Sequence, residues 1–239
     1  MLDKWLRSES AVSEVIGNIM IFSIVITSVG LVLLAGGPIM EGAMDLSKMD
    51  YITSTFLMVQ SEINRVAYNQ VPYQNIHLKL GGGSLILDPD NNVNNITLYV
   101  NGTNFSCRDS LEYSYKGTHM AYINGGVYQL YNSGSAEMIS PPRTYVRQNM
   151  TYVSLYHLTG YISRGGAGNE LLLIEYNTTQ VNKYQPAPGN NLTIMLEGPY
   201  ADVQGRYLEG QGFFRTVGTN YTIASEYVII TQYFLSVKD

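Results

Sequence analysis

Cysteine and positive charge are both scarce in this sequence. Its single cysteine, Cys107, has no partner for an internal disulfide, which argues against a disulfide-stapled secreted fold. The chain carries 14 Lys and Arg against 19 Asp and Glu, and no basic residue lies between Arg7 and Lys48. Binding to nucleic acid needs a stripe of Lys and Arg that neutralises phosphates, and the sequence has no such stripe. We therefore expect no nucleic-acid partner.

The residue spacings that carry catalysis or metal binding are missing as well. His77, His119 and His157 are isolated in the sequence, and none belongs to a metal-ligand spacing such as H-x-x-x-H. Cys107 has no neighbouring His or basic cluster that would activate it as a nucleophile. The glycine-rich residues 165–168 lack the Lys-Ser/Thr that completes a phosphate-binding loop. The sequence therefore predicts no enzyme, no catalytic residues, no metal site and no cofactor.

A long apolar run near the N-terminus is the most informative feature that is present. Residues 10–35 contain roughly twenty apolar positions, enough to cross a hydrocarbon core about 30 Å thick. A secretory signal has its small-residue cleavage site after the apolar run, whereas here the small pair Ser10-Ala11 precedes it. Two interpretations stay open: a plain N-terminal membrane anchor, and a short leader that is cut on the cytoplasmic side.

The residues at this junction resemble a known family. Ala11 to Gly17 reads AVSEVIG, which is similar to the A-V-S-P-V-I-G opening of archaeal type IV pilins and pilin-like proteins, with Glu14 in the place of the usual Pro. The resemblance implies a class III leader over residues 1–11, removed by a prepilin peptidase between Ala11 and Val12. It also implies membrane insertion, then assembly on a pilus assembly platform with identical or related pilin subunits into an extracellular surface filament.

Glu14 and two glycines are the candidate assembly and register residues. After cleavage the new amine of Val12 is largely cationic at neutral pH, and the Glu14 carboxylate can pair with it or with the amine of a neighbouring subunit. Such a pair fixes register, because a misplaced partner leaves a buried charge uncompensated. The alternative places Glu14 among lipid headgroups, reaching water. Gly17 and Gly30 allow helices to approach closely.

The helical pattern changes beyond residue 37. Gly36-Gly37-Pro38 predicts an interruption, since Pro removes a backbone donor and Gly lowers helical propensity. We therefore expect a transmembrane or filament-core helix over residues 12–37 and an amphipathic helix over residues 38–70. The second helix packs on the following domain or, alternatively, forms a coiled coil with neighbouring subunits. Its apolar positions recur at steps of three or four: Leu46, Met49, Ile52, Phe56, Val59, Ile63 and Val66.

Residues 71–239 have the pattern of a β-rich domain. Alternating residues 76–80, then Gly81-Gly82-Gly83, then residues 84–88 predict a hairpin, and Asn124-Gly125-Gly126 predicts a second one. Residues 180–190 are expected to form a surface loop. Further strands are expected at residues 95–100, 110–115, 144–146, 152–158, 171–176, 192–196 and 227–237. The predicted fold class is α+β: a hydrophobic-then-amphipathic N-terminal helix followed by an antiparallel β-sandwich-like head.

Asn-x-Ser/Thr sequons are in excess over chance, and all lie beyond the apolar run. We expect them to be exposed, and several to carry glycans. The candidate positions are Asn95, Asn101, Asn104, Asn149, Asn177, Asn191 and Asn220.

Tyrosine is also unusually frequent, with 20 residues. It suits half-buried strands, and the alternative is an aromatic surface that binds a carbohydrate target or another subunit.

Two functions from different classes follow. The first is a structural subunit of an archaeal type IV pilus-like surface filament, major or minor, found in the cell membrane before assembly. Its glycosylated head lies outside the cell and takes part in adhesion. The alternative is a permanently membrane-anchored extracellular binding protein that does not polymerise. A component of the archaellum machinery is a weaker third option, because the head is larger than such a part needs.

Overall fold

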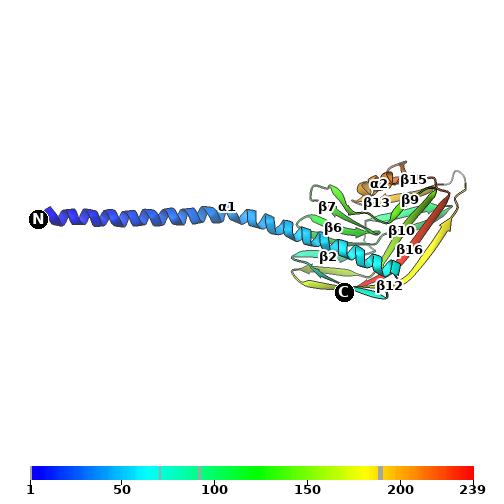
Figure 1. Cartoon of the computed structure of the whole chain (residues 1–239), viewed down its shortest axis with the longest axis horizontal. Helices are drawn as coiled ribbons and strands as arrows, with labels where there is room; N and C mark the ends of the chain where they lie inside the picture. The colour runs from blue at the N-terminus through cyan, green and yellow to red at the C-terminus, as the bar shows by residue number, and fades with distance from the viewer. Residues whose placement is uncertain (1, 70, 91–92, 188–190) are drawn as a thin grey trace. The chain divides into compact units, whose positions relative to one another are not determined.

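The computed structural model describes residues 2–69, 71–90, 93–187 and 191–239, and the side chains of the first range from residue 15 onward. The chain divides into two compact units, Met1–Asp50 and Tyr51–Asp239. We call them the helix unit and the β unit. Figure 1 shows that the first is purely helical, and that the second combines the last turns of the same helix with β-strands and a short helix.

Helix α1 (Leu2–Asn69) contains Pro38 and is not interrupted there, so the expected break at Gly36-Gly37-Pro38 is wrong. A proline inside a helix costs about 3 kcal/mol and removes one hydrogen bond, while each glycine costs about 1 kcal/mol. Helices that cross membranes tolerate Gly and Pro more readily than other helices do.

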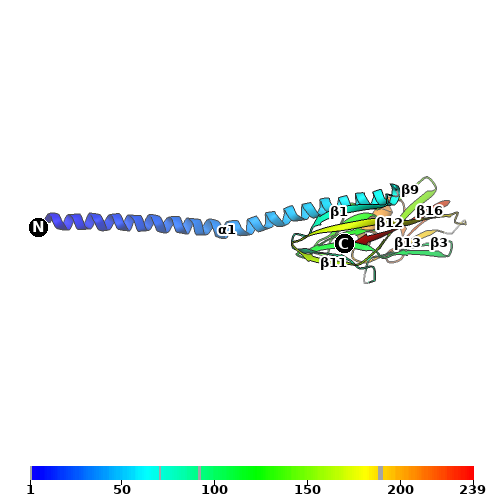
Figure 2. The same cartoon turned by 90° about the horizontal axis from the view of Figure 1, so that it is seen from below.

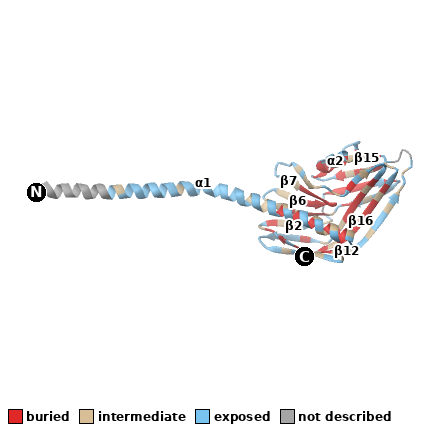
Figure 3. Ribbon diagram, viewed as in Figure 1, coloured by how far each residue is buried: buried red, intermediate tan, exposed pale blue. Residues whose placement is uncertain are grey.

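The last part of α1 belongs to the β unit and presents one apolar face to it. Ile52, Phe56, Val59, Ile63 and Val66 are each at most 1% exposed, at the expected steps of three or four. Figures 1 and 2 show this part of the helix lying along one face of the strands, and Figure 3 shows its buried residues in red.

The buried stripe is shorter than the sequence predicts. Leu46, expected to be its first member, is 70% exposed and lies in the helix unit. The stripe therefore begins at Ile52 rather than at Leu46. The helix ends at Asn69, ahead of Pro72, because the residue before a proline is driven out of the helical region.

The strands form three sheets, which confirms the α+β class. The first sheet has the order β1 (Tyr73–Lys79), β12 (Asn169–Tyr184), β16 (Tyr227–Lys238), β10 (Met150–Thr159), β9 (Thr144–Arg147). The second has the order β11 (Ile162–Gly166), β2 (Gly83–Leu87), β5 (Ser110–Tyr115), β6 (Thr118–Ile123), β7 (Gly126–Leu130), β8 (Ala136–Ser140). The third has the order β14 (Phe214–Arg215), β15 (Asn220–Ile223), β13 (Leu192–Glu197), β3 (Asn95–Val100), β4 (Thr103–Cys107).

One expected hairpin is confirmed and one is wrong. β6 and β7 pair across Asn124 and Gly125, whose φ values of 44° and 86° are the left-handed conformations that such a turn requires. β1 and β2 do not pair: β1 joins β12 in the first sheet, and β2 lies between β11 and β5 in the second. The three glycines after β1 therefore carry the chain from one sheet to another.

Three further features differ from the sequence-based expectation. β10 and β16 run parallel, with Met150 opposite Tyr227, so the sheets are mostly but not entirely antiparallel. β12 continues to Tyr184 because it pairs with β16 along that length, so the expected loop at residues 180–190 starts too early. Helix α2 (Ala201–Gly210) was not predicted, since its Gln, Arg and Gly residues weaken the apolar pattern.

The main core of the β unit lies between strands of all three sheets and α2. It combines aliphatic side chains of β3, β10, β13 and β16 with Val203 and Leu208 of α2. Tyr128, Tyr200 and Tyr221 extend the same cluster. Because side chains in a protein core are closely packed, a substitution that leaves a cavity lowers the stability of the unit.

The buried stripe of α1 supplies the first testable prediction. We expect Phe56→Ala to lower the free energy of unfolding of the β unit by about 3–5 kcal/mol, because it removes a fully buried ring and leaves a cavity. The matched control, Leu57→Ala, changes a neighbouring side chain that is 38% exposed and should cost less than about 1 kcal/mol. Denaturant unfolding of the full chain in detergent measures both, and equal losses would contradict the packing described.

Candidate functional site

The part of α1 that belongs to the helix unit has an exposed apolar surface. Between Val15 and Met40 its large apolar side chains are 52–77% exposed, on every side of the helix. The described part of α1, from Val15 on, contains a stretch long and apolar enough to cross a membrane. Figure 3 shows these residues in pale blue. A helix that is apolar all round is stable only when lipid or other protein covers it.

The hydroxyl groups of this surface are satisfied within the helix itself. Ser23 Oγ donates to the carbonyl oxygen of Ile19 at 2.8 Å, and Thr27 Oγ1 donates to that of Ser23 at 2.7 Å. An unpaired hydroxyl is costly in an apolar medium, whereas these bonds return each hydroxyl to the preceding turn. The surface can therefore enter a membrane or a helical core without leaving these two polar groups unsatisfied.

The two glycines expected to act in assembly face different directions. A Cβ atom placed on Gly17 or on Gly30 would meet nothing within 4 Å, so neither glycine is required by packing inside the helix unit. At 3.6 residues per turn they point about 140° apart. Residues spaced by seven share a face, which places Gly30 with Ser23 and Gly37 instead. We call Ser23, Gly30 and Gly37 the small-residue face.

The residues assigned to leader cleavage and register lie outside the described side chains. The backbone of α1 runs through Ala11, Val12 and Glu14. The expected cut between Ala11 and Val12, and the expected pairing of Glu14, therefore stay predictions from the sequence.

A group of hydrogen bonds fastens the end of α1 to the strands. Tyr156 Oη of β10 lies 2.7 Å from Tyr68 Oη and 2.9 Å from Asn64 Oδ1. Gln60 Nε2 donates to the carbonyl oxygen of Gly125 at 2.7 Å. Together with the buried stripe, these bonds fix both the position and the rotation of the helix on the β unit. Burial raises the pKa of Tyr156, so its phenol stays protonated and keeps these bonds.

The ring of Tyr68 is held from two sides. It meets the ring of Tyr233 edge to face, with centroids 5.1 Å apart, and the Arg143 guanidinium lies 4.5 Å from its centroid. Sequence reasoning missed this cluster, because its members come from α1, from the segment before β9 and from the two parallel strands. The frequency of tyrosine was the available signal, but it does not say which rings meet.

Tyrosine side chains occur both in the core and on the surface of the β unit. The fully buried ones pack in the core, among them Tyr113, whose pKa burial raises to about 12 and whose hydroxyl donates to the Leu80 carbonyl oxygen at 2.6 Å. Others are exposed, including Tyr145, which stacks on Tyr152 with centroids 5.0 Å apart. A partly exposed aromatic pair of this kind is compatible with contact to a sugar or to another subunit.

The candidate glycosylation sites differ in exposure. Asn101, Asn104, Asn149, Asn177 and Asn191 are exposed, and Asn220 is partly buried. Asn95 is only 6% exposed, so its expected exposure is wrong. Its Nδ2 donates to Glu197 Oε2 at 2.7 Å, and its Oδ1 accepts from Ser106 Oγ at 2.8 Å. Strand β3 turns this side chain inward, where the amide joins β4 and β13.

The three histidines and the single cysteine, for which the sequence predicts no catalytic or metal-binding role, lie on different strands of the β unit. His77 is exposed on β1, and His119 is partly exposed on β6. Cys107 is buried at the end of β4, where burial and the charge of Asp109 raise the pKa of its thiol to about 12. A thiol of this kind is a poor nucleophile. His157 lies on β10 and faces Asp109.

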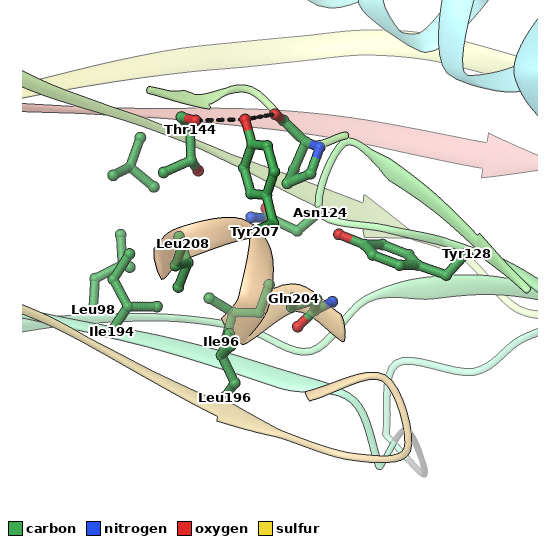
Figure 4. Close-up of a pocket in the computed structure, with 12 residues that line it drawn as sticks. Ile96, Leu98, Asn124, Tyr128, Thr144, Ile194, Leu196, Gln204, Tyr207 and Leu208 are labelled. Carbon is green, nitrogen blue, oxygen red and sulfur yellow. Dashed lines mark hydrogen bonds between the residues drawn. The ribbon is translucent and has the colours of Figure 1, made fainter. Parts of the chain in front are cut away.

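A small cavity lies between α2 and the strands beside it (Figure 4). Its lining is mostly apolar, and Tyr207 closes one side by donating to the carbonyl oxygens of Pro142 and Thr144. Its volume of about 20 Å³ is room for one water molecule. The cavity is a gap in the packing, too small for a substrate.

A known family model matches the chain over residues 10–234. The chain belongs to DUF7289, a family of unknown function. The match covers most residues of both compact units. Comparison with curated proteins and with solved structures gives no match.

Sequon exposure supplies the second prediction. Peptide mapping by mass spectrometry of the native protein should find glycans on exposed sequons such as Asn101 and Asn177, and none on Asn95, whose amide is already bonded inside the fold. Asn177→Gln should then remove glycan mass without changing stability. Asn95→Gln should lower the free energy of unfolding by about 1–3 kcal/mol, because Glu197 loses its partner. A glycan on Asn95 of the folded protein would contradict this assignment.

Proposed function

We propose that the chain is a structural subunit of an archaeal type IV pilus-like surface filament. It is made with a leader, cut between Ala11 and Val12, and assembled through its N-terminal helix. The exposed apolar surface of α1 between Val15 and Met40 carries this proposal. The AVSEVIG junction at residues 11–17 supports it, since the sequence resembles pilin-like proteins at that place.

Leaving this apolar surface of α1 in water is costly in free energy. Covering a single Val, Leu or Ile side chain is worth about 1.5–3 kcal/mol. The exposed apolar residues of the helix unit include Ile24, Leu31, Val32, Leu33 and Leu34 among others, so the total exceeds the stability of a typical domain, which is about 5–15 kcal/mol. Lipid covers the surface before assembly, and the helices of other subunits cover it afterwards.

The small-residue face supports helix-to-helix packing over lipid alone. In an apolar medium, helices associate through close van der Waals contact, which small side chains allow. Ser23, Gly30 and Gly37 follow one another along α1 at steps of seven, and no packing inside the helix unit uses the two glycines. A neighbouring helix that lies along this face approaches the backbone more closely than it can elsewhere.

The attachment of the end of α1 to the strands suits a subunit that transmits mechanical force. The helical core of a filament transmits force only if each helix is fixed to its own head. Phe56 and Val59 bury their side chains in the β unit, and Tyr68 and Asn64 bond to Tyr156. The exposed sequons and the stacked Tyr145 and Tyr152 fit a head that faces the surroundings and takes part in adhesion.

The N-terminal sequence of the protein tests the proposal. We expect a mature terminus at Val12, or within one or two residues of it, in surface material that is released by shearing. Ala11→Glu puts a bulky charge at the cleavage position and should leave the uncut chain in the membrane fraction. The control Ser8→Ala changes the leader away from the cut and should behave as the unaltered chain does.

An uncut chain that occurs only in membranes would contradict the proposal. The protein would then be a permanently anchored surface protein whose head binds its target without polymerising.

A further inference from the structure

Three side chains of metal-ligand type meet at the end of β4. The Cys107 Sγ, Asp109 Oδ2 and His157 Nδ1 atoms all lie within 4.8 Å of one another, in a search limited to the described residues. Sγ and Oδ2 are 4.0 Å apart, and Nδ1 and Oδ2 are 3.6 Å apart. Bonds of about 2.0–2.3 Å in a tetrahedral zinc site separate the ligand atoms by about 3.3–3.8 Å. Small side-chain rotations would therefore bring the three atoms onto one ion.

The backbone around the cluster holds two of these atoms in place. Asp109 Oδ2 accepts a hydrogen bond from the Leu158 N–H at 3.1 Å. Cys107 Sγ donates to the Tyr156 carbonyl oxygen at 3.2 Å. Both partners flank His157 on β10. The cluster therefore joins the third sheet, through β4, to the first sheet, through β10.

The orientation of His157 is set by groups on its other side. Its Nε2 lies 3.2 Å from Gln232 Oε1, while the Gln232 amide nitrogen lies 3.5 Å from Asn182 Oδ1. The ring also stacks on Phe234, with centroids 4.5 Å apart and planes 9° apart. A proton on Nε2 that is donated to Gln232 leaves Nδ1 with a lone pair that faces the Asp109 carboxylate. Two such acceptors repel each other unless a proton or a metal cation lies between them.

We propose that Cys107, Asp109 and His157 form a binding site for a divalent zinc-type cation, with water as the fourth ligand. A thiolate and an imidazole select zinc-type ions over Ca²⁺ and Mg²⁺, which prefer oxygen ligands alone. The side chains of His157 and Asp109 are 15% and 12% exposed, which gives the ion and its water a way in. The contact between His157 Nε2 and Gln232 Oε1 is the outer contact that ligating histidines usually make, with Nε2 as the donor when Nδ1 holds the ion.

Binding replaces one proton by one ion. The Cys107 thiol releases its proton to solvent as the sulfur–metal bond forms, so its hydrogen bond to the Tyr156 carbonyl oxygen is lost, and no electron is transferred. The bound ion neutralises the partly buried carboxylate of Asp109. It also ties two sheets together in a chain whose single cysteine cannot form an internal disulfide, which is a structural role. No local pattern predicts the site, because His157 lies fifty residues from Cys107 and reaches it only through strand packing.

Cobalt binding to the full chain in detergent tests the proposal. The protein is first stripped with a chelator and then titrated with Co²⁺ and, separately, with Zn²⁺. Because Cys107 is the only cysteine, a sulfur-to-cobalt charge-transfer band can arise only from this site. We expect the band to appear with one Co²⁺ per chain and to be displaced by Zn²⁺. Saturating Zn²⁺ should raise Tm by at least about 3 °C.

Matched variants separate the site from general effects of metal. His157→Gln and Asp109→Asn should weaken cobalt binding at least tenfold, and Cys107→Ala should abolish the charge-transfer band. His119→Gln removes a partly exposed histidine elsewhere and should leave the titration unchanged. If the site variants do not fold, the cobalt titration of the unaltered chain still tests the proposal. The absence of the charge-transfer band in the unaltered chain, or an equal zinc-induced rise in Tm in Cys107→Ala, would overturn the proposal.

Discussion

The uncovered apolar surface of α1 is the constraint on which the rest of this molecule depends. A helix whose side chains are apolar all round between Val15 and Met40 cannot remain in water, and its own hydroxyls at Ser23 and Thr27 are already bonded within the helix. Something apolar must therefore cover it. Lipid and neighbouring helices meet this need equally well in energy. The sequence of the junction at residues 11–17 and the small-residue face favour neighbouring helices as the final cover.

The other end of the same helix has the opposite requirement, since it must not separate from the β unit. Side chains such as Phe56 are removed from water completely, and the bonds around Tyr156 fix the rotation of the helix. Apolar burial gives the strength of this attachment, and hydrogen bonding gives its orientation. The same helix therefore has an exposed apolar surface in its first part and a buried apolar face in its last part. It continues from one to the other without a break at Pro38.

Local patterns predicted the parts of this fold that depend on local geometry. The spacing from Ile52 to Val66 identified the buried face of α1, and Asn124-Gly125 identified the β6–β7 turn, because each signal depends on neighbouring residues. Features formed by residues far apart in the sequence were missed or wrong. Nothing near Met150 indicates that β10 runs parallel to β16, and nothing near Gly83 indicates that β2 leaves β1 for another sheet.

The candidate functional residues follow the same division. The resemblance at residues 11–17 is visible in the sequence because those residues are contiguous, and it stays a prediction. The Tyr68, Tyr156 and Tyr233 cluster and the group of Cys107, Asp109 and His157 were not, since strand pairing brings their members together across long stretches of chain. The burial of Asn95 was likewise hidden, because a sequon records only a local pattern and not the direction in which β3 turns its side chain.

Cross-linking along the small-residue face tests the central claim most directly. Ser23→Cys places an accessible thiol on that face, and the only other cysteine, Cys107, is buried. After mild oxidation of cells that carry this variant, surface material released by shearing should contain covalent dimers. Ser114→Cys, on β5 of the head, serves as the control and should give none. Monomers alone from Ser23→Cys, found only in membranes, would show that lipid is the final cover of the helix and would contradict the account.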